Sequence, residues 1–156
     1  MNFFKSLAIT AISAVTLATS PAIASTLTEG ETKLVNALDQ AGVEVHVGTC
    51  PTDGAYGMYN SKLNAIGICT NVATTVEQRW ETLRHEAVHA AQRCVNPSMA
   101  FTVKSSDYLM KNGLQSDWSF IQKAYDKSDW AIELEAFTLM RTSNSTVASL
   151  VNAACN

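Results

Sequence analysis

The chain has 156 residues, 47% of them hydrophobic, and its 11 lysines and arginines against 14 acidic residues give a net charge of −3 at pH 7. Because cations are few and form no basic run, nucleic acid and anionic membrane surfaces are poor candidate partners. The length is enough for one domain with a hydrophobic core and too short for two.

The first 24 residues have the features of a cleavable signal peptide. Lys5 precedes the apolar run 6–19, and residues 22–24 read Ala-Ile-Ala, which suits a signal peptidase. A membrane helix is the alternative, but the run is shorter than the about 20 residues that cross a bilayer. We therefore expect cleavage after Ala24 and export to a periplasm or out of the cell. The mature chain 25–156 would lack Lys5 and carry 10 cationic and 14 acidic residues, a net charge of −4.

One helix and three strands are expected before the middle of the chain. Apolar residues recur at helical spacing over 28–41, and Gly42 suits the end of that helix. Segment 43–47 alternates with period two, segment 54–59 is rich in glycine and tyrosine, and segment 64–69 is short and β-branched. Turn residues separate the three segments, so the simplest arrangement is a three-stranded antiparallel sheet.

A long amphipathic helix is expected next. It should begin after Thr74 or Thr75, either of which can cap it, and end near Cys94, before Pro97. At 100° per residue, its apolar and polar side chains fall on opposite faces. The apolar face holds Trp80, Leu83, Ala87, Ala90, Ala91 and Cys94, and the polar face holds Gln78, Glu81, Thr82, His85, His89 and Gln92. The two histidines should therefore face away from the main core, and a solvated face without a metal is the alternative interpretation.

Residues 85–89 of this helix read His-Glu-Ala-Val-His, which is the HExxH pattern. Because helical positions i and i+4 project from one face, both His85 and His89 can reach a single Zn²⁺ while Glu86 lies beside its open coordination position. This arrangement is typical of hydrolases. The pattern is short, so its interpretation depends on whether the rest of the chain supplies a third ligand.

The C-terminal third is expected to be helical. Segment 96–113 has no clean period and is expected to be mostly loop with room for a short helix. Helices are expected at 117–125, at 129–140 with Ser128 as the N-cap, and from residue 144 or 145 through 153. Together with the sheet, these helices indicate a single α+β domain that is mainly helical, with the HExxH helix at its centre.

Four cysteines lie in the expected mature chain. An even number in an exported domain of this size favours two disulfides, for which three connectivities are possible. A four-cysteine zinc site is the alternative, but the cysteines are scattered and form no CxxC pair. Cys50 and Cys69 bracket the strand-rich segment, Cys94 ends the HExxH helix and Cys155 is next to last. We therefore expect the pairs Cys50–Cys69 and Cys94–Cys155.

A catalytic zinc usually has three protein ligands, so the two histidines need a partner from elsewhere. His46 precedes the motif on an expected strand, and Gln92 stands where the metzincin pattern HExxHxxGxxH requires glycine. A carboxylate from the helix around 130–137 remains. Glu133 has an almost wholly apolar surround, in which an unpaired carboxylate would be costly, and is preferred over Glu135. Two solvent-facing glutamates are the alternative interpretation.

An HExxH helix followed some tens of residues later by a helical ExxA segment resembles the gluzincin group of zinc metallopeptidases. In that group the glutamate three residues before a small residue is the usual third ligand, and Glu133 and Ala136 match that pattern. Phe137 departs from it, because many members carry Asp or Asn there to support the first histidine. The chain also resembles small exported bacterial proteins with this motif and no assigned activity.

The resemblance implies a zincin-like fold and a peptidase mechanism. Zn²⁺ on His85, His89 and Glu133 would lower the pKa of its bound water, and Glu86 would take the proton as general base. The resulting hydroxide would attack a peptide carbonyl. The sequence does not rank the side chains that could hold the oxyanion, which are Tyr56, Tyr59, Tyr108, Tyr125 and His46.

The sequence leaves two other functions open. One is an exported binding or toxin-like module in which HExxH is incidental or holds a metal without turnover. The other is a zinc hydrolase of non-peptide bonds. In the peptidase, segment 64–69 would be an edge strand that pairs with extended substrate, although a sheet that only covers the helix is the alternative. Arg84 and Arg93 flank the motif and are expected to be solvated or in ion pairs.

Overall fold

The computed structural model describes residues 27–51, 54–96 and 115–156. The expected signal peptide with its cleavage site at Ala24, and nearly all of the expected loop 96–113, lie outside these residues. None of the helices in the described part of the chain combines the length and apolar character that crossing a membrane requires.

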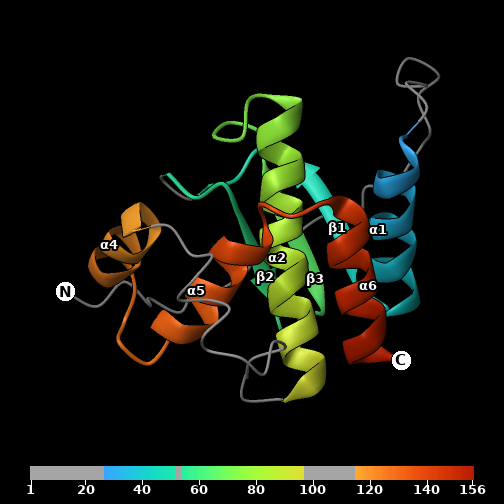
Figure 1. The fold of residues 1–156 in the computed structure, drawn as a ribbon. Coiled ribbons are helices and arrows are strands. Elements are labelled where there is room, and N and C mark those ends of the chain that lie inside the picture. Colours follow the sequence, from blue (N-terminus) through green and yellow to red (C-terminus); the bar gives the residue numbers. More distant parts are fainter. Residues whose placement is uncertain (1–26, 52–53, 97–114) are drawn as a thin grey trace.

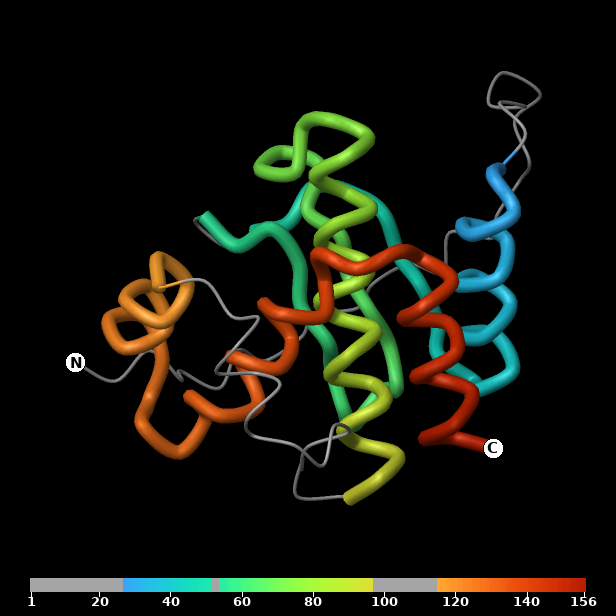
Figure 2. The backbone as a smooth tube through the Cα atoms, in the orientation of Figure 1, coloured from blue at the N-terminus to red at the C-terminus, as the bar shows by residue number. Residues whose placement is uncertain are grey.

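The described residues form an α+β domain around one central helix (Figure 1). Its helices are α1 (Glu29–Gln40), α2 (Val76–Val95), α4 (Gln115–Ala124), α5 (Trp130–Leu139) and α6 (Asn144–Cys155), and its strands are β1 (Glu44–Gly48), β2 (Gly57–Asn60) and β3 (Ala65–Cys69). The sheet lies behind α2, α1 and α6 run side by side on one flank of α2, and α4 and α5 lie on the other (Figure 2). The expected order of helices and strands is confirmed.

Side-chain caps explain where most of the helices begin. The Thr28 and Thr75 hydroxyls each accept the backbone N–H three residues on, and both helices have a complete capping box. Ser143 caps α6 in the same way, with its Oγ 3.1 Å from the Thr146 nitrogen. The expected Ser128 cap of α5 is wrong: the N-cap is Asp129, which already has helical dihedral angles and makes no side-chain cap. The Ser128 hydroxyl instead donates to the Asp129 carboxylate at 3.2 Å.

The sheet is mixed, so the expected all-antiparallel arrangement is wrong in one pairing. Its strand order is β1-β3-β2, with β2 antiparallel and β1 parallel to β3. A tight turn makes β2 and β3 a hairpin, which local turn residues predict. The direction of β1 depends on which edge of that hairpin it reaches, and neither alternation nor turn chemistry encodes this. Strand β3 is consequently central and paired on both sides, so segment 64–69 is not the edge strand that we expected for substrate.

The hydrophobic core lies between α2, the sheet and the pair of helices α1 and α6. The largest apolar side chains of this core that are fully buried come from all of these elements: Leu34, Leu38, Ile66, Val88, Val147 and Val151. Small residues, Ala87, Ala90 and Ala91, are buried on α2 and allow the neighbouring elements to approach it closely.

Helix α2 is buried around its whole circumference along its middle, from residue 82 to residue 92, which the sequence did not predict. Every residue from 82 to 92 is buried, because α5 covers the polar face while the core covers the apolar one. His85 and His89 are each only 7% exposed, so the solvated-face interpretation is wrong. Arg84 is buried rather than solvated, and the ion pair that was the other expectation is present with Glu77 at 3.1 Å. Arg84 also donates to the Met140 carbonyl and to the Asn144 amide oxygen.

The disulfides are those expected from the positions of the cysteines. Cys50 bonds to Cys69 at the end of β3, and Cys94 near the end of α2 bonds to Cys155 at the end of α6. No cysteine is free. The second bond ties the C-terminal helix to the helix that carries HExxH. Two disulfides in a chain of this size indicate an oxidising environment.

Candidate metal centre

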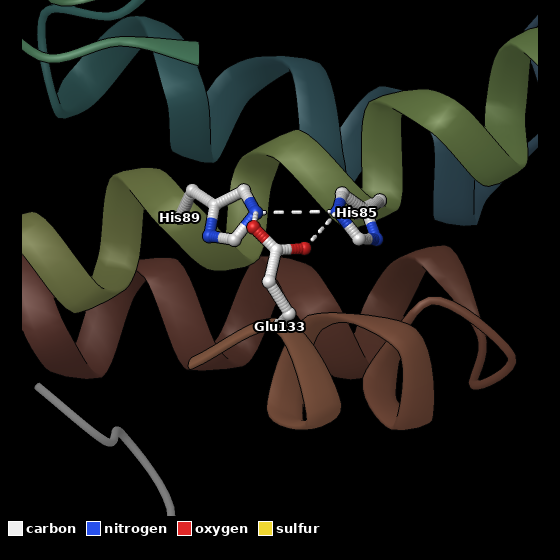
Figure 3. A group of neighbouring side chains, drawn as sticks. All are labelled: His85, His89 and Glu133. Atoms are coloured by element: carbon white, nitrogen blue, oxygen red, sulfur yellow. Dashed lines mark hydrogen bonds and ion pairs between the residues drawn. The ribbon is translucent and has the colours of Figure 1, made fainter. Parts of the chain in front are cut away.

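Three side chains from two helices meet in a buried cluster (Figure 3). His85 and His89 lie one turn apart on α2, and Glu133 comes from the first turn of α5. The two Nε2 atoms are 3.2 Å apart. The Glu133 carboxylate lies 3.4 Å from the His85 Nε2 through Oε2 and 3.5 Å from the His89 Nε2 through Oε1. The fold thus brings together the three residues that the sequence suggested.

Both candidate carboxylates are buried, and only one of them is in the cluster. Glu133 is 8% exposed and Glu135 is fully buried, so the interpretation of two solvent-facing glutamates is wrong. Glu135 accepts a hydrogen bond from Gln92 at 2.7 Å and is not part of the cluster. Ala136, three residues after Glu133, is fully buried in the hydrophobic core. A larger side chain there would overpack that core.

The cluster has the donor set and spacing of a metal site. Two donors that each lie about 2.0–2.1 Å from a tetrahedral ion are separated by about 3.3 Å, and the three donor distances here are 3.2, 3.4 and 3.5 Å. The Glu133 Oε2 atom is buried and has no hydrogen-bond partner, which a cation would remedy. Among the described residues, this is the one group of histidine, cysteine or acidic side chains that could hold a metal ion.

The cluster is strongly coupled electrostatically. Burial alone would lower the pKa of His89, but the hydrogen bond to Glu133 and the negative charges of Glu86 and Glu133 outweigh it and raise the pKa from 6.5 to about 9. Burial alone would raise the pKa of Glu133, but the neighbouring His85 and His89 imidazoles lower it from 4.5 to about 2. The metal-free cluster is therefore an imidazolium–carboxylate pair at neutral pH.

A cavity of about 360 Å³ adjoins the cluster. His85 and Glu86 line it from α2, and its other walls include Gly57, Tyr125, Phe137 and Met140. The Phe137 ring packs edge-on against the His85 imidazole with 4.8 Å between ring centroids. A ligand that contacted a metal ion at the cluster would need a space of this kind beside it.

At Gly57, strand β2 passes close to α2. A Cβ atom added at Gly57 would lie 2.5 Å from the Thr82 methyl carbon and 2.8 Å from the Gly67 carbonyl oxygen. It would also lie 3.5 Å from Glu86 Cγ. Only glycine therefore allows the strand to pass this close to the helix, beside Glu86.

Of the five side chains proposed for oxyanion binding, Tyr125 is the one best placed. It follows α4 and lines the cavity. Burial, followed by the negative charges of Glu133 and Glu86, raises the pKa of Tyr125 well above its usual value, so the phenol stays protonated and can donate. The others are less suitable or outside the described residues. Tyr56 is 49% exposed at the cavity rim, Tyr59 donates to Asn64, His46 pairs with Glu44 on the sheet, and Tyr108 is not described.

Sequence reasoning missed the side chain that supports the second histidine. The sequence places Gln92 on the polar face of the helix and gives it no role beyond excluding the metzincin pattern, yet its Oε1 lies 2.8 Å from the His89 Nδ1. It follows His89 by three residues on the same helix, so the i, i+3 spacing was the available signal. The partner of Gln92 on α5, Glu135, carried no such signal because the packing of two distant helices creates that contact.

Fold and site define a disulfide-bonded α+β domain with a buried His-His-Glu cluster that could hold a metal ion. The chain belongs to the family described as a domain of unknown function, DUF8637, whose sequence model matches residues 22–155. No curated protein and no solved structure is detectably similar to it.

Proposed function

We propose that this protein is an exported, zinc-dependent metallopeptidase. The observation that carries the proposal is the cluster itself: two imidazole nitrogens and a carboxylate, largely excluded from water, with donors 3.2–3.5 Å apart and a cavity beside them. A structural role alone would not require an open cavity at the cluster. The gluzincin resemblance, on His85, Glu86, His89, Glu133 and Ala136, supports the same conclusion.

Zinc is the metal that this donor set favours. Two imidazoles with one carboxylate and a fourth position left to water is a common composition of catalytic zinc sites. Magnesium and calcium prefer all-oxygen ligands, and the cluster contributes two nitrogens. The described part of the chain brings no cysteine to the cluster, because all four are in disulfides.

Glu86 is the proposed general base. It follows His85 on α2, is 7% exposed and lines the same cavity as His85, so a water bound to the metal on the cavity side would lie near it. When bound, zinc would lower the pKa of a coordinated water and polarise a carbonyl oxygen. Glu86 would take the proton from the attacking water and deliver it to the leaving amine. Tyr125, protonated and directed to the same cavity, would donate to the oxygen that becomes negatively charged.

Export is part of the proposal. The expected signal peptide ending at Ala24 agrees with the two disulfides, which form and persist in oxidising compartments. The partner would be a peptide or protein substrate outside the cytoplasm. Nucleic acid does not fit a chain with net negative charge and no basic run.

The test is metal content and turnover of the exported protein. Purified without chelator, it should carry one zinc per chain and hydrolyse peptides in a mixed library, and a chelator should abolish the hydrolysis until zinc is returned. The absence of stoichiometric metal would favour the binding or toxin-like module. One zinc per chain with cleavage of ester or amide substrates and of no peptide would favour a hydrolase of non-peptide bonds.

The raised pKa of His89 predicts that zinc binding releases a proton. Since the pKa of His89 is about 9 in the folded metal-free protein, a metal at pH 7.5 must displace about one proton. The apparent affinity for zinc should then rise about tenfold per pH unit up to about pH 9. Calorimetric titrations in buffers of different ionisation enthalpy measure the proton release directly, and no release would contradict the cluster described above.

The same shifts predict how pH affects the stability of the metal-free protein. The raised pKa of His89 adds stability that is complete below 6.5 and lost as pH rises through about 9, and the lowered pKa of Glu133 adds stability that is present above 4.5 and lost as pH falls through about 2. The stabilisation from His89 and Glu133 together should therefore be greatest between about pH 4.5 and pH 6.5. Chemical unfolding of the chelator-treated protein at a series of pH values tests this.

The cavity predicts a substrate preference. Its walls on the side of α4 and α5 are apolar, with Phe120, Phe137 and Met140, while Glu81 and Glu86 make it unfavourable for acidic groups. We expect preferred cleavage next to a large apolar residue. Phe137→Ala should reduce kcat/KM for such peptides about 10-fold or more relative to peptides with alanine at that position. Leu63→Ala, an exposed apolar residue outside the cavity, is the control and should leave the ratio unchanged.

A further inference from the structure

A buried side-chain amide connects the candidate metal ligand His89 to a second carboxylate. Gln92 is fully buried, and its Oε1 lies 2.8 Å from the His89 Nδ1. Its Nε2 donates to the Glu135 Oε2 at 2.7 Å and to the Ile132 carbonyl at 3.0 Å. Glu135 is fully buried as well. None of these contacts is needed to explain the HExxH or ExxA patterns.

The chemistry of these groups leaves one orientation for the amide. A carboxylate and a carbonyl both face one end of the Gln92 amide, and both can only accept, so the NH₂ group must lie at that end. The amide oxygen is then directed at His89. Because an amide oxygen can only accept, the Nδ1 of His89 must carry a proton, and its Nε2 is the nitrogen left to bind a metal.

We infer that Glu135 and Gln92 are positioning residues: together they hold the His89 ring with Nδ1–H bonded and Nε2 directed at the cluster. The inference rests on the proposed metal site. Hydrogen bonds to Glu135 and to the Ile132 carbonyl on α5 fix the orientation of the Gln92 amide. The packing of α5 on α2 therefore positions both the proposed ligand Glu133 and the residues that support His89. A hydrogen bond at the second nitrogen fixes a histidine ligand and raises its basicity.

This arrangement compensates for the departure at Phe137. Gluzincin members with Asp or Asn at that position use it to support the first histidine, whereas Phe137 here packs its ring against His85. The polar support is instead found at the second histidine, His89, through Gln92. Helix α5 therefore contributes Phe137 to the apolar wall of the cavity. It also contributes Glu135, which accepts a hydrogen bond from Gln92.

The test compares Gln92→Met with the unsubstituted protein. Methionine has a similar length and neither accepts strongly nor donates, so the His89 Nδ1–H loses its acceptor while the packing volume is nearly kept. Zinc affinity, measured by competition with a chelating dye, should fall about 10–100-fold. In NMR spectra of the metal-free protein, a slowly exchanging Nδ1–H signal of His89 should be present in the unsubstituted protein and absent from the variant.

A polarity swap provides the rescue. Gln92→Glu alone places two carboxylates together and should weaken zinc binding. Adding Glu135→Gln restores a donor beside the new carboxylate, which still accepts from His89, so the double variant should regain most of the affinity and the Nδ1–H signal. Thr138→Val is the matched control, because it removes a buried hydroxyl of α5 that bonds only within its own helix. It should bind zinc as the unsubstituted protein does.

The outcomes separate this inference from the proposed function. Unchanged zinc affinity in Gln92→Met, with zinc bound normally by the unsubstituted protein, would overturn the positioning role and leave the metal site intact. Absence of the protected Nδ1–H signal from the unsubstituted protein would also overturn it. A third outcome is that the unsubstituted protein binds no zinc but shows the Nδ1–H signal, and that Gln92→Met loses the signal. This would reject the proposed function and retain the hydrogen bonds from His89 to Gln92 and from Gln92 to Glu135.

Discussion

Glu86→Gln is expected to retain zinc and to lower kcat by about 10²–10⁴, which is the range for loss of a general acid–base group. The amide has the same shape as the carboxylate but cannot take a proton from water. Glu86 lies in the cavity wall, outside the donor set of His85, His89 and Glu133, so the metal should remain bound. Metal content and peptide hydrolysis measured on the same preparation provide both readouts.

Two further variants make this prediction specific. His85→Ala removes a proposed ligand and should lose metal and activity together. Glu81→Gln removes an equal charge from the same cavity, about one turn before Glu86 on the same helix, and should change kcat little. If Glu81→Gln lost as much activity as Glu86→Gln, the effect would be one of cavity charge rather than proton transfer. If Glu86→Gln kept full activity, the peptidase mechanism would be wrong.

The parts of the molecule that were predictable depend on local spacing. His85 and His89 share a helix face because of the 3.6-residue period, and Thr28 and Thr75 cap their helices through contacts three residues away. The disulfide pairs followed from where the cysteines fall relative to the expected elements. Glu133 was preferred because an apolar surround makes an unpaired carboxylate costly, and the cluster provides the partners that this argument required.

The parts that were not predictable depend on contacts between distant elements. A helical wheel separates polar from apolar residues but does not indicate that a second helix will cover the polar face, as α5 covers that of α2. The direction of β1 depends on a crossing of the chain rather than on its own residues. Likewise, Gln92 is informative only once Glu135 and the Ile132 carbonyl lie beside it.

Burial of the polar face also bears on function. Charges withdrawn from water interact more strongly, and their burial costs free energy unless they are paired. Two histidines and two glutamates are buried along the interface between α2 and α5. Apolar side chains of similar volume at these positions would often give a protein that is equally stable or more stable. These polar side chains lie at the cluster and in the hydrogen bonds that support it. A metal site would account for polar residues at these buried positions.

Glu133→Gln is expected to weaken zinc binding by more than the about 10–100-fold that loss of a supporting hydrogen bond costs, since it removes the one charged side chain from the proposed ligand set. In the metal-free protein, the pKa of His89 should fall from about 9, because burial would no longer be opposed by the Glu133 charge. Glu135→Gln is the matched control on α5: it keeps an acceptor for Gln92 and should cost less than about 10–100-fold. Chelator competition and NMR titration measure these effects, and a larger loss from Glu135→Gln than from Glu133→Gln would reverse the assignment of the third ligand.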